Sequence, residues 1–285
     1  MAPRLFRFVQ LEVPWPLGPD DGRYVMRRHA GEQPEQVLVI ATLGAAQRRL
    51  IGGKRARTAD PEPGPTPVAT GRATIIPAEP LESGDAAAAW LRAADGEAEY
   101  AAALAVLNRA LHGHRVATAD ADVREVGRDD PLVVRLGFGA GEQVAEGRWT
   151  DALELPPPRA RRQRRSAALR PQERLAALLG GRDAALACEL LTLRARTDLT
   201  AGRQREAALQ LRAALEAALA ELPAWAESGD LNVRLEELTE AQEDVAGAAA
   251  AALQRGLDPE EAETVERVLG RVEAALRARS AAGFL

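Results

Sequence analysis

The chain has 285 residues, enough for one large domain or two of ordinary size. Hydrophobic residues make up 46% and charged residues 28%, which is typical of a globular protein and argues against a disordered chain. The net charge of −5 gives no general attraction to nucleic acid or to anionic membranes. No stretch is apolar for long enough to form a signal peptide or a membrane span, so we expect a cytoplasmic protein without membrane contact.

The first half of the chain indicates short strands separated by Pro and Gly. The first four predicted strands cover residues 4–13, 23–28, 36–43 and 72–78. Residues 52–67 contain much Pro, Gly and charge and have no apolar periodicity. This composition predicts a mobile loop between the third and fourth strands.

Two helices and two more strands are predicted next. Ser83 can cap the first helix, and the second covers residues 96–113. The apolar face of the second helix comprises Tyr100, Leu104, Leu107 and Leu111. Gly113 is expected to end this helix. The further strands are predicted at residues 115–126 and 132–138.

These elements predict an α+β fold in two parts. Residues 1–155 would form a mainly antiparallel sheet with two helices, and residues 167–285 an antiparallel helical bundle. Between them, residues 156–166 are rich in Pro and Arg, which predicts a stiff, solvated linker. Residues 1–157 carry 18 basic and 22 acidic side chains, and residues 166–285 carry 14 and 20, so the linker is a basic segment between two acidic halves.

The second half carries apolar stripes at helical spacing. The stripes are Leu186, Leu190, Leu193; Leu211, Leu215, Ala218, Leu222; Leu231, Leu235, Leu238, Gln242, Val245, Ala249, Ala252; and Ala262, Val265, Leu269, Val272, Leu276. The third stripe predicts one continuous helix of three heptads with the polar Gln242 in its seam. Gly256 is expected to end that helix, and Asp258 is expected to cap the next one together with Glu261.

Residues 190–219 have the pattern of a helical hairpin. Gly202 and Arg203 form its turn, followed by the small residues Ala207, Ala208 and Ala214. In these positions, and in Glu206, the segment resembles a single tetratricopeptide-type helix pair, without the family's aromatic positions and without a repeat about 34 residues later. The resemblance implies a helical hairpin of the kind that binds protein partners.

The sequence GFGAGE, residues 137–142, follows a predicted strand and precedes a short helix, which is the order found in dinucleotide-binding loops. Gly137, Gly139 and Gly141 would let the backbone approach a phosphate, and they are the candidate cofactor-binding residues. The third fingerprint glycine should fall at position 142, where Glu142 would repel a pyrophosphate. We therefore favour a tight strand-to-helix turn and predict no cofactor.

His112, His114 and Asp120 could offer two imidazoles and a carboxylate to a metal ion. The alternative is that His112 lies in the last turn of a helix, where an imidazole suits the helix dipole. Cys188 is the only cysteine and lies in an apolar helical pattern, so we expect it to act as a small hydrophobic residue. No pattern assigns catalytic residues.

The function indicated is therefore non-catalytic protein interaction or assembly, with a second copy of the chain or another protein bound through the C-terminal helices. The first alternative is an enzyme or small-ligand-binding protein with a pocket near the loop at 137–142. The second is nucleic-acid binding through the five arginines of residues 159–165, although no aromatic side chain is interleaved among them.

Overall fold

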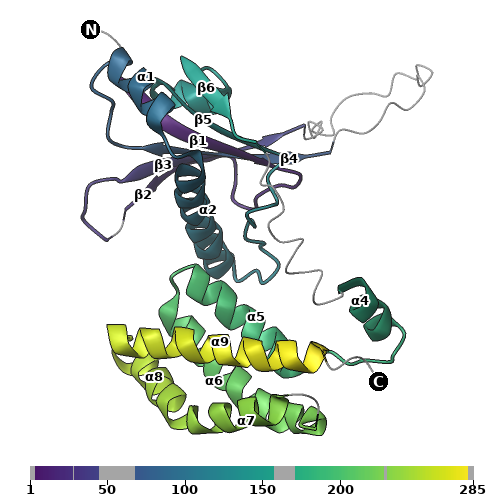
Figure 1. The fold of residues 1–285 in the computed structure, drawn as a ribbon. Coiled ribbons are helices and arrows are strands. Elements are labelled where there is room, and N and C mark those ends of the chain that lie inside the picture. Colours follow the sequence, from purple (N-terminus) through teal and green to yellow (C-terminus); the bar gives the residue numbers. More distant parts are fainter. Residues whose placement is uncertain (1–3, 28, 45–67, 157–170, 228–229, 282–285) are drawn as a thin grey trace, which may run out of the picture. The chain divides into compact units, whose positions relative to one another are not determined.

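A computed structural model gives the fold of the chain (Figure 1). It describes residues 4–27, 29–44, 68–156, 171–227 and 230–281. The loop predicted at residues 52–67 and nearly all of the linker predicted at residues 156–166 lie outside the described residues. The chain divides into two compact units, residues 1–159 and 160–285. The expected fold class, an N-terminal antiparallel sheet with two helices followed by a helical bundle, is confirmed.

Six antiparallel strands form the sheet of the N-terminal unit, in the spatial order β2-β3-β4-β1-β5-β6. They are β1 (Leu5–Val13), β2 (Gly22–Met26), β3 (Gln36–Leu43), β4 (Thr70–Pro77), β5 (Val133–Ala140) and β6 (Asp151–Glu154). Side chains alternate between the two faces of a strand, so Val9 and Leu11 of β1 belong to one buried cluster and Phe8 to another. Both faces of the sheet therefore carry apolar packing.

The helices α1 (Gly84–Ala93) and α2 (Gly96–Thr118) pack on the face that carries Val9 and Leu11. Ser83 caps α1 as predicted, since its hydroxyl oxygen accepts a hydrogen bond from the Ala86 amide at 3.1 Å. The opposite face is covered in part by the 3-10 helix η1 (Gly141–Glu146) and by Trp149, whose ring stacks on Phe8 with centroids 5.7 Å apart.

The strand predicted at residues 115–126 is wrong. The helix α2 does not end at Gly113 but continues to Thr118, and Ala119 ends it with a left-handed backbone. The backbone beyond α2 forms hydrogen bonds with a side chain instead of with a neighbouring strand. The side-chain Nδ2 of Asn108 donates to the backbone carbonyl of Val126 at 2.9 Å, and its Oδ1 accepts from the backbone N–H of Val126 at 2.8 Å. These bonds satisfy the backbone without a ladder.

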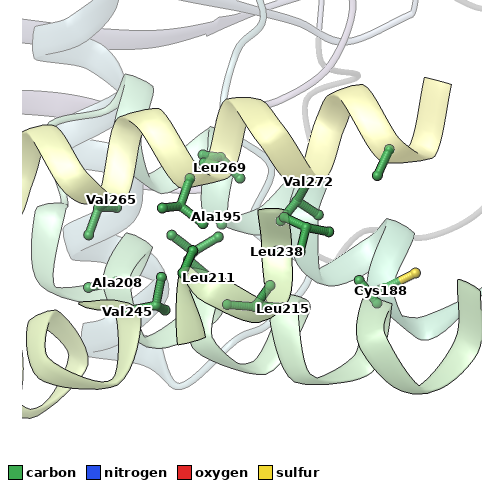
Figure 2. Packing of buried hydrophobic residues seen from close by; sticks show 14 of the residues in the cluster. Cys188, Ala195, Ala208, Leu211, Leu215, Leu238, Val245, Val265, Leu269 and Val272 are labelled. Carbon is green, nitrogen blue, oxygen red and sulfur yellow. The ribbon is translucent and has the colours of Figure 1, made fainter. Parts of the chain in front are cut away.

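The C-terminal unit is helical. Its helices are α4 (Pro171–Leu179), α5 (Ala187–Thr200), α6 (Gln204–Glu221), α7 (Leu231–Glu240), α8 (Gln242–Gln254) and α9 (Pro259–Ala281), with the 3-10 helix η2 (Leu222–Trp225) after α6. Figure 2 shows leucine and valine side chains from these helices meeting in one core, which includes Leu211, Leu215, Leu238, Val245 and Leu269. Many other core positions are alanines, which let the helix backbones approach closely.

The continuous helix predicted through Gln242 is wrong, because the chain breaks between α7 and α8 at Ala241. This break buries Ala241 and leaves Gln242 exposed, so the seam has no polar residue there. The next boundary is as predicted: Gly256 follows α8 with φ +87°, and Asp258 and Glu261 form a reciprocal capping box with both bonds at 2.9 Å. No helix in the described part of the chain is both long and apolar enough to span a membrane.

Candidate functional site

The candidate cofactor-binding glycines do not lie together in one turn. Gly137 and Gly139 are inside β5, paired with Phe8 and Phe6 of β1. A Cβ atom on Gly137 would lie 2.8 Å from the Ala152 Cβ, and it would also meet a backbone oxygen. The glycines therefore allow β6 and the segment before it to pass close to β5.

The space over Gly139 is likewise filled by protein. A Cβ atom there would lie 2.7 Å from Val144 Cγ1 and 3.0 Å from the Trp149 Cα. Val144 is fully buried beside Phe8 in an apolar cluster. Only Gly141 lies at the turn, with φ +59°, and it begins the six-residue η1. A phosphate therefore finds no open cradle between these three glycines.

The candidate metal ligands are also held apart. Because α2 continues past Gly113, His112 and His114 are two residues apart within a helix and point in different directions. The Nδ1 atom of His112 lies 3.9 Å from Glu125 Oε1, while the His114 ring packs beside Gly18. Asp120 lies beyond the helix, and its side chain accepts a bond from the Asp122 amide at 2.9 Å.

Across the described residues, no group of three or more His, Cys, Asp or Glu side chains is arranged to hold a metal ion. The one cysteine, Cys188, is fully buried in the core of the C-terminal unit. Burial, assisted by the neighbouring Glu221, raises the pKa of its thiol to about 12. It is therefore protonated at neutral pH, which disfavours a nucleophilic role.

A buried ionic cluster joins α9 to the start of the C-terminal unit. Arg279 is only 4% exposed, and it donates to Asp183 at 2.6 Å and to Glu189 at 3.4 Å. Arg174 of α4 binds the same two carboxylates, and Arg279 lies 4.5 Å from the ring centroid of Trp225. Each charge has a partner of opposite sign, so the cluster has a structural role. In the sequence, this cluster is indicated by Arg279, which occupies the next position of the apolar stripe of α9, three residues after Leu276.

The stripe of Leu186, Leu190 and Leu193 is placed differently from the other stripes. The core side of α5 is formed instead by Cys188, Thr192 and Ala195. Leu190 and Leu193 point outward, 52% and 65% exposed, while Leu186 before the helix is half-buried at the edge of the core. We call the surface of Leu190, Leu193 and Thr197, at spacings of three and four, the outer face of α5. Its two leucines lie outside the unit's core.

The stripes predicted at residues 231–252 and 262–276, in contrast, lie mainly in the core. Leu231, Leu238, Val265, Leu269 and Val272 are all fully buried within the C-terminal unit. They are therefore satisfied by neighbouring helices of the same chain. Any association through the C-terminal helices would have to use another surface, and the outer face of α5 supplies one.

The helices α5 and α6 form the hairpin implied by the resemblance to a tetratricopeptide-type pair, with Gly202 at its turn in a left-handed conformation. Comparisons of the chain with protein-family models, with curated proteins and with solved structures found no match.

Proposed function

We propose that this chain is a non-catalytic assembly protein that pairs with a second copy of itself through the outer face of α5. The observation that carries the proposal is the exposure of Leu190 and Leu193 on one side of a single helix. Soluble monomers tolerate scattered exposed leucines, whereas contiguous apolar stripes commonly mark interaction surfaces. Covering the exposed part of such a leucine contributes on the order of 1–2 kcal/mol of favourable transfer free energy.

The spacing of the stripe favours a second copy as the partner. When two copies of α5 lie antiparallel, Leu190 of one faces Leu193 of the other. The stripe is thus complementary to itself, as a two-fold symmetric interface requires. Only one helix per chain contributes, so we expect a weak dimer that dissociates on dilution.

Sedimentation velocity of the full-length protein over a range of concentrations tests this proposal. Leu193→Glu places a charge in the centre of the pairing. Leu253→Glu is the matched control, because Leu253 is also 65% exposed but lies on α8. We expect the wild type and Leu253→Glu to form dimers at high concentration, and Leu193→Glu to associate at least tenfold more weakly.

Two outcomes would contradict the proposal. One is a wild-type protein that stays monomeric at every concentration, which would mean that α5 is covered in some other way or not at all. The other is equal weakening by both substitutions, which would show that added charge matters and the position does not. Circular dichroism of both variants verifies that the helices are retained.

A further inference from the structure

The N-terminal unit contains a cleft of about 340 Å³ between the first turns of α2 and the sheet. Its floor includes Val9 of β1 and Ile75 of β4, which are paired across the two strands. Its helical wall includes Ala98 and Ala102. Its volume falls in the range typical of sites for small molecules.

Small side chains on α2 create this cleft. Ala98, Ala102 and Ala103 face it, whereas Leu107 and Leu111 further along the helix are fully buried in the core against the sheet. The same helix therefore fills its contact with the sheet at one end and leaves it open at the other. The cleft is distant in sequence from the glycines at 137–141, and none of them lines it.

The polar groups at the cleft are mainly hydrogen-bond acceptors. The Gln36 Oε1 atom is buried and has no hydrogen-bond partner in the structure as described. Glu99 and Asp95 also line the cleft, against the single cation Arg7. The Arg7 Nη1 atom lies 3.9 Å from Glu99 Oε1, so the two side chains form an ion pair without a hydrogen bond. Because the Gln36 Oε1 atom is closed off from solvent, an occupant would meet the two carboxylates instead, and these accept hydrogen bonds from an N–H donor.

We propose that the cleft binds a small primary amine with a compact apolar body. The ammonium group would donate to the Glu99 carboxylate, and the apolar body would lie on Val9 and Ile75. Since two carboxylates and one guanidinium line the cleft, a single ammonium neutralises the local charge. A carboxylate ligand would meet two like charges and offer them no hydrogen-bond donor.

Titration of the full-length protein with phenethylamine, followed by amide NMR shifts, tests the proposal. Phenylacetate is the matched probe of opposite charge. We expect saturable shifts for Gln36 and for residues 98–103 with the amine, and at least tenfold weaker binding of the acid. Equal affinity for both probes, or shifts confined to other regions, would overturn it.

Two substitutions on one turn of α2 sharpen the test. Ala102→Leu fills the cleft, while Ala101→Leu adds the same side chain to a neighbouring exposed position that does not line it. We expect Ala102→Leu to weaken amine binding at least tenfold and Ala101→Leu to change it less than twofold. Unchanged binding in Ala102→Leu, with the thermal midpoint retained, would contradict the assignment.

Discussion

The two units use different means to fix their packing. In the sheet unit, Gly137 and Gly139 admit no side chain, because protein atoms already occupy the space where a Cβ would lie. In the helical unit, alanines at many core positions leave helices close together, and a buried charge, Arg279 of α9, binds the carboxylates of Asp183 and Glu189. A glycine-rich motif therefore marks close packing in one unit, while a charged residue at core spacing marks an ion cluster in the other.

Arg279→Met should have the largest effect on stability. The substitution removes the hydrogen bonds that Arg279 donates to Asp183 and Glu189. Because Arg174 still binds both carboxylates, we expect a loss of about 1.5–3 kcal/mol of unfolding free energy. Arg212→Met is the control, because its pair with Glu216 is exposed and contributes about 0.5 kcal/mol or less. Urea unfolding, with hydrogen exchange to follow the helical unit, measures both. A similar small loss in the two variants would mean that the cluster does not organise this unit.

Gly137→Ala tests the sheet unit and should cost about 1–3 kcal/mol, because the new methyl group overpacks the crossing at Ala152. Gly113→Ala is the matched control. Gly113 lies inside α2 with open space around it, so alanine there should stabilise the unit by about 0.5–1 kcal/mol. Thermal unfolding of both variants distinguishes them. A neutral Gly137→Ala would show that the glycine is not needed for packing.

Acid should weaken the helical unit by a smaller amount. Burial would raise the pKa of Asp183, but hydrogen bonds from Arg279 and from the Ala184 amide lower it below its ordinary value of 3.8. A carboxyl group with a lowered pKa contributes stability above its unfolded-state pKa, and this stability is lost as the pH falls through the folded-state value. We expect the wild type to lose stability below about pH 4, and Asp183→Asn to lose less over the same range. Parallel pH profiles of unfolding free energy would contradict this.

The sequence predicted elements best where local signals determined them. The residue pattern predicted β3 at residues 36–43, and the capping box at Asp258 predicted the start of α9. It failed after the end of α2 and between α7 and α8. The side chain of Asn108 on α2 holds the segment after residue 118 without a strand, and the break at Ala241 leaves Gln242 exposed instead of placing it in a helix seam.

The candidate sites show the same limit. Strand-then-glycine order did not reveal that Gly137 and Gly139 are closed in by β6 and by Trp149, because that crossing depends on tertiary contacts. The sequence showed the apolar spacing of α5, but it did not show which side of the helix would pack into the core. No sequence pattern indicated the cleft, because its lining residues come from β1, β3, β4 and α2 and meet only in the folded unit.

The most direct test of the proposed assembly is oxidative cross-linking between copies of α5. An equimolar mixture of Leu190→Cys and Leu193→Cys chains is oxidised, and Cys188 stays inert because burial raises the pKa of its thiol to about 12. Antiparallel pairing brings position 190 of one copy beside position 193 of the other, within reach of a disulfide. We predict a covalent dimer formed mainly of one chain of each kind. No dimer, or equal yields from a Leu253→Cys chain alone, would contradict the account.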